Sequence, residues 1–235
     1  MPQPRSWQAE ACRPFPVIAP VPTAGSTLPV VETFHSLQGE GLHTGRSAFF
    51  VRLAGCDVGC SWCDTKHSWP EAAHPRRSVA ELVAEAGRAR EQGAAFVVVT
   101  GGEPLQHDLD PLCTALAPAG LPLHLETSGA HPLSGHFDWL TLSPKPHLPP
   151  GDALLAACDE LKVVVQEAAD LAFAEAMAAR AGELRREKGA AAAGPALLLQ
   201  PAWGEPEGQR LALDHVRRHS AWRLSLQTHK VLDVR

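Results

Sequence analysis

The segment AFFVRLAGCDVGCSWCDT, residues 48–65, joins an apolar run to three cysteines that fall within eight positions. Residues 48–53 are rich in the aromatic and β-branched side chains that favour a buried strand. Gly55 and Gly59 allow the backbone that follows to wrap closely around a bulky object. The pattern therefore predicts a metal-binding loop directly after a strand. Its expected ligands are Cys56, Cys60 and Cys63.

The cysteine spacing favours an iron–sulfur cluster over a structural zinc ion. A structural zinc ion normally takes four protein ligands, usually as two separated pairs, and the sequence has no second Cys-x-x-Cys pair. His67 or His74 could supply a fourth ligand, so zinc stays an alternative. A [4Fe-4S] cluster takes one ligand per iron, and three cysteines leave one iron open for chemistry. Cys113 and Cys158 lie in helix-like apolar contexts and are expected to be buried free thiols.

The length and composition of the chain fit one compact domain. Its 235 residues, 45% hydrophobic and 20% charged, are enough for a full-sized core. The net charge of −5 provides no basic field for a phosphate backbone, which argues against nucleic-acid binding. No apolar run approaches the roughly 20 residues that span a bilayer, and residues 1–28 lack the core of a signal peptide. We expect a cytoplasmic protein that binds neither nucleic acid nor membrane.

Prolines mark the predicted domain boundary. Six of residues 1–27 are proline, which blocks both helices and sheet ladders, so this segment is expected to be a poorly ordered extension. Residues 28–235 would form the domain. Strands are expected at 29–34, 48–53, 96–99, 121–125, 139–142, 161–165, 196–199 and 222–226. Helices are expected at 78–93, 109–116, 170–188 and 209–218, with a flexible tract at 189–194.

Alternating strands and helices predict an α/β fold with a mostly parallel sheet. Strands that lack polar alternation indicate that both faces of the sheet are covered. Five or six such units suit an open, incomplete TIM-like (β/α) barrel. In that architecture the chemistry gathers at the carboxyl ends of the strands. The glycine-rich and polar motifs of this chain follow its predicted strands directly, as the architecture requires.

A second motif, TGGEP at residues 100–104, follows the predicted strand 96–99. Two glycines after a strand expose backbone polar groups to a ligand, although an ordinary turn is the alternative. Together with Cys-x3-Cys-x2-Cys, the motif resembles the signature of the radical S-adenosylmethionine (SAM) superfamily. The resemblance implies that SAM chelates the open iron and is cleaved to a 5′-deoxyadenosyl radical, while the protein positions and shields the reactants.

Further motifs narrow the resemblance. They are FHSLQGEG (34–41), FVRLAGC (50–56), WCDT (62–65), ETSG (126–129), LSPK (142–145) and LQTHK (226–230). From about residue 28 to residue 235 the chain resembles the 7-carboxy-7-deazaguanine synthase family. This implies contraction of 6-carboxy-5,6,7,8-tetrahydropterin to 7-carboxy-7-deazaguanine with loss of ammonia, on the route to queuosine and other 7-deazapurines. It also implies a homodimer, bound Mg²⁺, and an external flavodoxin- or ferredoxin-like electron donor.

The resemblance assigns Glu40 and Arg52 as the expected catalytic residues. Arg52 would offer a planar fork to the substrate carboxylate, which lysine reproduces poorly; a surface salt bridge is the alternative. Gln38 and Glu40 would read the donor and acceptor edge of the pterin, unless they only cap a turn. Thr65 would contact Mg²⁺, which keeps waters and takes other oxygens from the substrate; capping the next turn is the alternative.

The resemblance also implies the remaining contacts. The SAM site would include Gly102, Ser143, Pro144, Lys145, Gln200, Pro201, Ala202 and Trp203. The substrate pocket would include Leu37, Gln38, Gly39, Glu40, Arg52, Thr100, His229 and the terminal carboxylate of Arg235.

Two other functions fit parts of the sequence. An activating enzyme that places a glycyl radical on a partner protein would share the cluster. It would need a protein-docking surface where Gln38, Glu40 and Arg52 are expected to converge on a small ring. A non-catalytic zinc-binding module would share only the cysteines, and anaerobic iron and sulfide analysis separates it from both enzymes.

Overall fold

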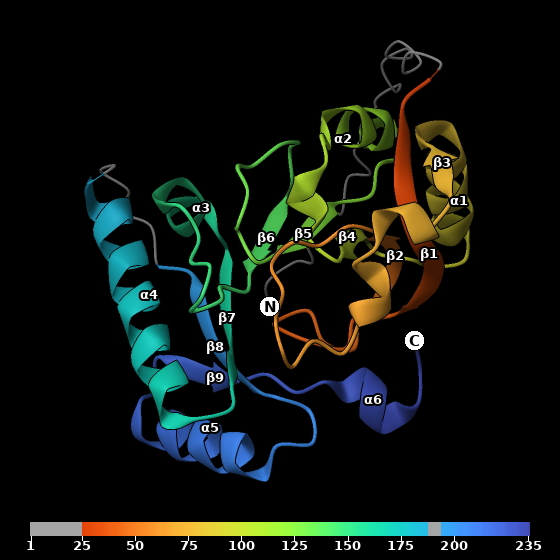
Figure 1. Ribbon diagram of the computed structural model, residues 1–235. Helices are drawn as coiled ribbons and strands as arrows, with labels where there is room; N and C mark the ends of the chain where they lie inside the picture. The colour runs from red at the N-terminus through yellow and green to blue at the C-terminus, as the bar shows by residue number, and fades with distance from the viewer. Residues whose placement is uncertain (1–24, 188–193) are drawn as a thin grey trace, which may run out of the picture.

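The computed structural model describes residues 25–187 and 194–235 (Figure 1). Residues 1–24 of the expected extension lie outside this description, as do residues 188–193, which include most of the flexible tract expected at 189–194. Among the described residues, no helix has the length and apolar character needed to cross a bilayer.

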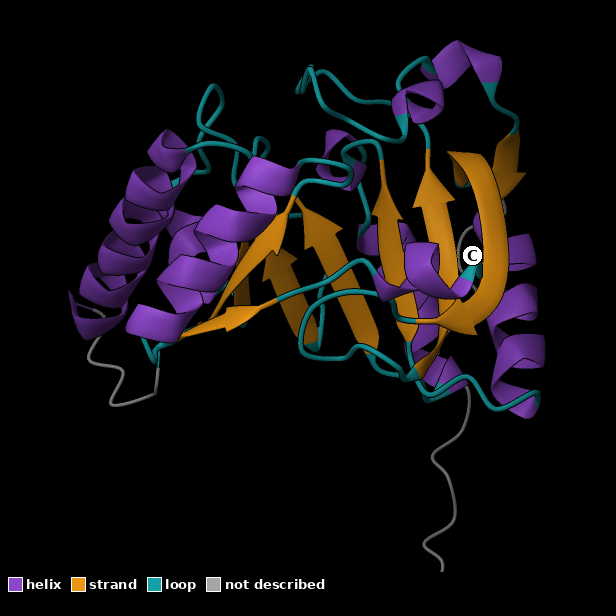
Figure 2. Cartoon of the chain, turned by 90° about the horizontal axis from the view of Figure 1, so that it is seen from below, coloured by secondary structure: helices purple, strands orange, loops and turns teal. Residues whose placement is uncertain are grey.

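In the described part of the chain, nine strands form one sheet in the order β3-β1-β2-β4-β5-β6-β7-β8-β9. From β2 to β9 each strand pairs in parallel with its neighbour, whereas β1 is antiparallel to both β2 and β3. The edge strands β3 and β9 do not pair, so the sheet stays open and curved (Figure 2). This confirms an incomplete barrel. The strands are β1 (Thr27–Leu37), β2 (Ser47–Leu53), β3 (Arg76–Ser78), β4 (Val97–Gly101), β5 (Leu123–Thr127), β6 (Trp139–Leu142), β7 (Glu160–Val165), β8 (Ala196–Pro201) and β9 (Trp222–Leu224).

Across the described residues, helices connect the parallel strands, except β5 and β6, which are joined without a helix, and they cover one face of the sheet. They are α1 (Val79–Glu91), α2 (Asp110–Leu116), α3 (Asp152–Ala157), α4 (Ala168–Glu187) and α5 (Pro206–Arg218), with α6 (Thr228–Leu232) near the C-terminus. Short 3-10 helices are η1 (Lys66–Ser68), η2 (Glu71–Ala73), η3 (Pro104–Gln106) and η4 (Ala117–Ala119). The predicted capping box is present, because Ser78 and Glu81 bond each other's backbone N–H at the start of α1. The sequence did not predict β3, α3 or α6.

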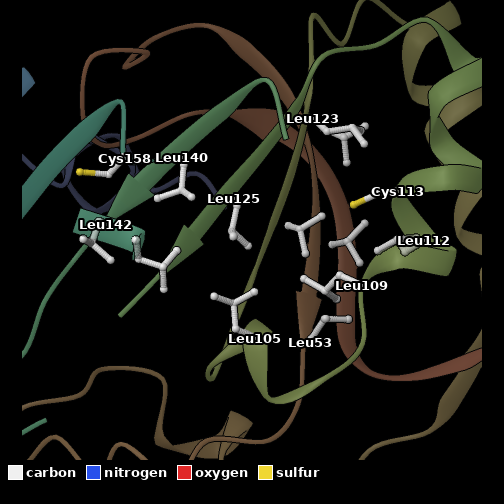
Figure 3. Packing of buried hydrophobic residues seen from close by; sticks show 14 of the residues in the cluster. Leu53, Leu105, Leu109, Leu112, Cys113, Leu123, Leu125, Leu140, Leu142 and Cys158 are labelled. Carbon is white, nitrogen blue, oxygen red and sulfur yellow. The ribbon is translucent and has the colours of Figure 1, made fainter. Parts of the chain in front are cut away.

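Alternate residues of each strand enter two different environments. Val97 and Val99 of β4 pack into the large apolar cluster with α1 to α5, whereas Val98 faces the other way. Figure 3 shows leucines of β5 and β6 packed beside those of α2, with Cys113 and Cys158 among them. Both cysteines are buried free thiols, as predicted. We call the opposite side, which carries Val98, the inner face.

The inner face carries two layers of side chains because neighbouring strands are in parallel register. In the lower layer, Phe50 pairs with Val98 and Val98 with His124. In the upper layer, at the carboxyl ends of the strands, Arg52 pairs with Thr100. The strands were expected to lack polar alternation, but polar and apolar residues do alternate in β5. There His124 and Glu126 each follow a buried leucine. The lower layer is apolar and aromatic, and the upper layer is polar.

An aromatic cluster closes the amino-terminal side of the inner face. The His124 ring stacks on Phe96 at 4.2 Å between centroids, and the His43 ring lies 4.7 Å from His124 and 4.6 Å from Trp139. The guanidinium of Arg46 covers the Phe96 ring at 4.9 Å. A buried imidazole among rings and a guanidinium is destabilised by protonation.

We expect His124 to make the fold less stable in acid. Burial, and then the neighbouring His43 and Arg46, lower the pKa of His124 from 6.5 to about 4. Below pH 6.5 the unfolded chain therefore binds more protons, and stability present above that pH is lost as the pH falls towards 4. The expected loss from this residue is about 2 kcal/mol between about pH 7.5 and pH 5.

Urea unfolding of the cluster-free protein at both pH values measures this loss. His124→Phe should lose less stability on acidification than the wild type, whereas His67→Ala, which removes an exposed histidine, should behave like the wild type. Equal losses in the wild type and His124→Phe would contradict the prediction.

Candidate functional site

A cavity of about 450 Å³ opens at the carboxyl ends of the strands. The upper polar layer forms its floor. Its walls come from the cysteine loop (residues 54–65), the start of the glycine-rich loop after β1 (residues 38–46), and α6. Parallel strands bring their ends to one side of a sheet, so the site combines residues from distant parts of the sequence. The floor contains Arg52, Thr100, Glu126, Thr141, Lys162 and Gln200.

The cysteine loop is fixed to the TGGEP turn by backbone contacts. The Glu103 N–H donates to the Gly55 carbonyl at 2.8 Å, and the Gly55 N–H donates to Ser68 at 2.8 Å. A Cβ on Gly102 would lie 2.3 Å from the Gly55 oxygen and 2.7 Å from the Cys56 Cβ. Glycine is therefore required at residue 102, because the two segments approach too closely for a side chain.

The donor set fits an iron–sulfur cluster. Cys56, Cys60 and Cys63 all line the cavity. Burial raises the thiol pKa of Cys56 and Cys60, so metal binding must displace their protons. Within the described ranges, no three His, Cys, Asp or Glu side chains converge on a position for a single metal ion. Three thiolates around a larger cluster need no such convergence, since each binds a different iron.

The histidines considered as zinc ligands lie elsewhere. His74 Nε2 is 2.7 Å from the carbonyl oxygen of His67, and neither residue lines the cavity. A different histidine approaches the cysteine loop: His147 Nε2 lies 2.8 Å from the Val58 oxygen and 4.0 Å from the Cys60 sulfur. The short contact to Val58 shows that His147 braces the loop.

Glu103 of the TGGEP motif supports the wall of the cavity from behind. It is 1% exposed and accepts from the N–H groups of Leu105 and Ser128, at 3.0 and 2.8 Å. The Thr127 hydroxyl donates to it at 2.5 Å. These donors satisfy a buried carboxylate, as burial requires. Glu103 therefore joins the TGGEP turn to the ETSG segment and does not line the cavity.

Glu40 forms a buried ion pair with Lys162. The Lys162 ammonium donates to Glu40 Oε2, and the two side chains are 6% and 17% exposed. Gln227 Nε2 donates to Glu40 Oε1 at 2.9 Å. Burial alone would raise the pKa of Glu40, but Lys162 and Gln227 lower it to about 2. Glu40 is thus a carboxylate at every physiological pH.

Gln38 has a fixed orientation in the cavity. Its amide nitrogen donates to Glu126 Oε1 at 2.9 Å, and its amide oxygen accepts from the Glu40 N–H at 3.1 Å. The Thr100 hydroxyl donates to the second oxygen of Glu126 at 3.3 Å. Gln38 therefore both caps the local turn and lines the cavity, so the two expected roles are not exclusive.

Arg52 is linked to the C-terminal end of the chain. Its Nε donates to Glu32 Oε1 at 3.0 Å, and the second oxygen of Glu32 accepts from Arg235. The Ser36 hydroxyl donates to the Arg235 oxygen. Arg52 is 21% exposed and lines the cavity together with Arg235. The salt bridge considered for Arg52 is present, and it orients the guanidinium inside the cavity.

The residues expected around SAM form a second part of the cavity wall. Lys145 Nζ donates to Ser143 Oγ at 2.8 Å and lies 5.0 Å from the Trp62 ring centroid. Burial lowers the pKa of Lys145 to about 8. Pro144, between them, is buried and is not part of the lining, whereas residues 200–203 all line the cavity.

Thr65 lies beside the cysteines at the cavity edge. It precedes η1, but its side chain makes no capping hydrogen bond there, so the capping role considered for it is not observed. Its hydroxyl is 3.5 Å from the Cys63 sulfur. The adjacent Asp64 accepts from Lys230 of α6.

Helix α6 closes the remaining side of the cavity. The Thr228 N–H donates to the Gly39 carbonyl at 2.9 Å. A Cβ on Gly39 would lie 2.2 Å from the His229 ring, so glycine permits this packing. Burial lowers the pKa of His229, which faces the cavity as expected.

The sequence did not assign the floor residues Glu126 and Lys162. Each follows a buried leucine of its strand, Leu125 before Glu126 and Leu161 before Lys162. A charge at such a position is a signal that the strand borders a polar site.

Comparisons with known proteins agree with this geometry. A model of the Radical SAM superfamily matches residues 51–142. The 7-carboxy-7-deazaguanine synthase of Prochlorococcus marinus is 50% identical over 220 residues, covering 88% of this chain and 98% of that protein. The protein of the same name from Escherichia coli K12 is 35% identical over 229 residues, with 88% and 98% coverage. A crystal structure of QueE from Escherichia coli superposes with a TM-score of 0.67 at 32% identity, covering 85% of this chain and 93% of the other.

Gly102→Ala should weaken cluster binding. The added Cβ meets the Gly55 oxygen and Cys56 Cβ well below 3.0 Å, so the cysteine loop must shift. We expect iron content after anaerobic reconstitution to fall below about half that of the wild type. In the matched control Gly87→Ala, the new Cβ has no atom within 4 Å. The control should bind full iron, and equal iron in both variants would refute the prediction.

Proposed function

The chain belongs to the 7-carboxy-7-deazaguanine synthase family of the radical SAM superfamily, and from this premise we propose how its residues carry out the reaction. The reaction contracts the ring of 6-carboxy-5,6,7,8-tetrahydropterin to 7-carboxy-7-deazaguanine and releases ammonia, a carbon–nitrogen lyase step of 7-deazapurine biosynthesis. One observation carries the proposal: three cysteines of a single loop line the same cavity as Gln38, Glu40 and Arg52.

Cys56, Cys60 and Cys63 hold the [4Fe-4S] cluster. When bound, the cluster and SAM supply a 5′-deoxyadenosyl radical, with an electron from an external donor. The Gly102 backbone, Ser143, Lys145 and residues 200–203 hold SAM against the cysteine loop. The Lys145 ammonium, close to Ser143 and Trp62, is placed to hold a carboxylate of the cofactor.

Arg52 and Glu40 orient the substrate. Arg52 binds the pterin carboxylate, because Glu32 holds its guanidinium through Nε and the planar fork suits a carboxylate. Glu40, which stays ionised, accepts hydrogen bonds from the N–H edge of the ring. Gln38, held by Glu126, reads the adjacent edge. Thr100, His229 and Arg235 complete the pocket, together with Leu37 and Gly39.

Thr65 holds Mg²⁺ beside the substrate. A single hydroxyl ligand suits Mg²⁺, which retains waters and takes oxygens from the substrate. The position of Thr65 next to Cys63, with no capping bond in η1, supports this role. When bound there, Mg²⁺ would supply a positive charge beside the substrate.

We further propose a cytoplasmic homodimer that receives its electron from a flavodoxin- or ferredoxin-like protein. Val231 and Leu232 of α6, 73% and 60% exposed, support an interface between copies of the chain. Residues 28–235 form the catalytic domain.

Anaerobic turnover tests the function directly. Reduced, reconstituted protein given SAM, Mg²⁺ and the tetrahydropterin should form 7-carboxy-7-deazaguanine, measured by mass spectrometry. Omitting Mg²⁺ should lower the yield. Cys60→Ala should lose iron and all activity, because it removes one of three cluster ligands. If the protein converted a different substrate but did not convert the tetrahydropterin, the function would be rejected.

Arg52→Lys should raise the substrate KM by about 10- to 100-fold, because an ammonium cannot form the two parallel bonds of a guanidinium. The rate of SAM cleavage in the absence of substrate should stay unchanged. The matched control is Arg76→Lys, an exposed residue paired with Glu71 outside the cavity. An unchanged KM in Arg52→Lys would show that Arg52 does not bind the carboxylate.

A further inference from the structure

Lys162 is a buried charge that the reaction as described does not use. It lies in β7 between Leu161 and Val163, which face the helices, so its side chain points to the inner face. The side chain is 6% exposed and lines the cavity floor. A lysine is seldom buried this completely without a specific partner.

The partner of Lys162 is Glu40, 122 positions away in the sequence. The ammonium binds Oε2, while Gln227 donates to Oε1 at 2.9 Å. The Gln200 side chain also hydrogen-bonds Glu40, so three donors hold this carboxylate. The two oxygens of a carboxylate together accept about four hydrogen bonds, which leaves one position for a ligand in the cavity.

The ion pair opposes the effect of burial on Glu40. Burial favours the neutral carboxylic acid, which would present a donor as well as an acceptor. The ammonium of Lys162, together with hydrogen bonds from Gln227 and Gln200, outweighs burial and lowers the pKa of Glu40 to about 2. Glu40 in turn helps to raise the pKa of Lys162 although burial lowers it.

We propose that Lys162 is a positioning residue for substrate recognition: its ammonium holds Glu40 as an oriented carboxylate that accepts the N–H edge of the pterin ring. The inference rests on the proposed function, because it assigns to Lys162 the task of fixing Glu40, the acceptor that the substrate contacts. Lys162 itself acts through Glu40.

Other charged groups also face this pair. Glu126 of β5 and Glu160 of β7 act on Lys162, and Lys145, Glu160 and His229 respond to the charge of Glu40. Burial lowers the pKa of Lys145 to about 8 and lowers that of His229 below its usual value, so binding by the wild type has a pH dependence of its own. The informative quantity is therefore the ratio of the variant's Kd to the wild-type Kd at each pH.

The test measures equilibrium binding of the product, 7-carboxy-7-deazaguanine, which keeps the amino-pyrimidinone edge of the substrate. Anaerobic calorimetry on SAM-loaded holoenzyme would cover about pH 6 to pH 8.5. In Lys162→Met, only the hydrogen bonds from Gln227 and Gln200 oppose burial, so the pKa of Glu40 rises and protonation in acid removes the acceptor. The Kd ratio should grow by about tenfold or more as the pH falls through this range.

Three further variants assign the effect to the charge of Lys162 on Glu40. Lys162→Gln keeps a hydrogen-bond donor without the charge, so its Kd ratio should rise in acid as that of Lys162→Met does. It replaces Lys162→Met in the test if that variant does not fold. Lys162→Arg keeps the charge and should give a flat ratio. The double variant Glu40→Gln, Lys162→Met should also be flat, because no titrating carboxylate remains at residue 40. The matched control Arg77→Met removes a half-buried partner of Glu85 outside the cavity and should give a flat ratio near one.

A flat ratio in both Lys162→Met and Lys162→Gln would overturn the proposal, since a structural role alone weakens binding equally at all pH values. A Kd ratio that still changes with pH in the double variant would also overturn the proposal, because a group other than Glu40 would then be titrating. Failure of the wild type to bind the product or convert the tetrahydropterin would instead reject the proposed function. The two failures are therefore distinguishable.

Discussion

The structure depends on the alternation of side chains along the parallel strands, which gives the sheet two unlike faces. In β7, Leu161 and Val163 pack against helices while Lys162 points the other way. Parallel register aligns such residues across the sheet, so Arg52 lies beside Thr100 and Glu126 beside Thr141. The helices stabilise one face by apolar burial. The other face is left for a polar floor at the carboxyl ends of the strands.

A polar floor inside a protein is stable only if its charges are paired. On the floor, Lys162 is paired with Glu40 and Glu126 accepts from Gln38; behind the cavity wall, Glu103 accepts from Thr127 and Ser128. Each partner comes from a different strand or loop. Removing one member of such a pair leaves a buried charge uncompensated, which costs more than an exposed ion pair contributes. The same contacts that make the floor stable therefore fix where its acceptors and donors point.

The C-terminal segment completes the site by binding parts of the chain from the opposite end of the sequence. Thr228 bonds Gly39, Lys230 bonds Asp64 of the cysteine loop, and Arg235 bonds Glu32. These contacts join the cysteine loop, the glycine-rich loop and β1 to the C-terminal segment that contains α6. The cysteine loop, the glycine-rich loop and the polar floor thus border a single cavity.

The sequence by itself determined the cysteine loop, the TGGEP turn and most strands and helices, because short-range spacing and apolar runs are local properties. It also predicted that Gln38, Glu40, Arg52, Thr100 and His229 share one pocket, through their resemblance to family motifs. Only the tertiary structure decided that β1 runs antiparallel beside β2, that α6 covers the cavity, and that Lys162 neutralises Glu40. Those features depend on strand register and on contacts between residues more than 100 positions apart, such as Glu40 with Lys162. Local pattern carries no information on such pairs, since any buried lysine and any buried glutamate look alike until the fold brings two of them together.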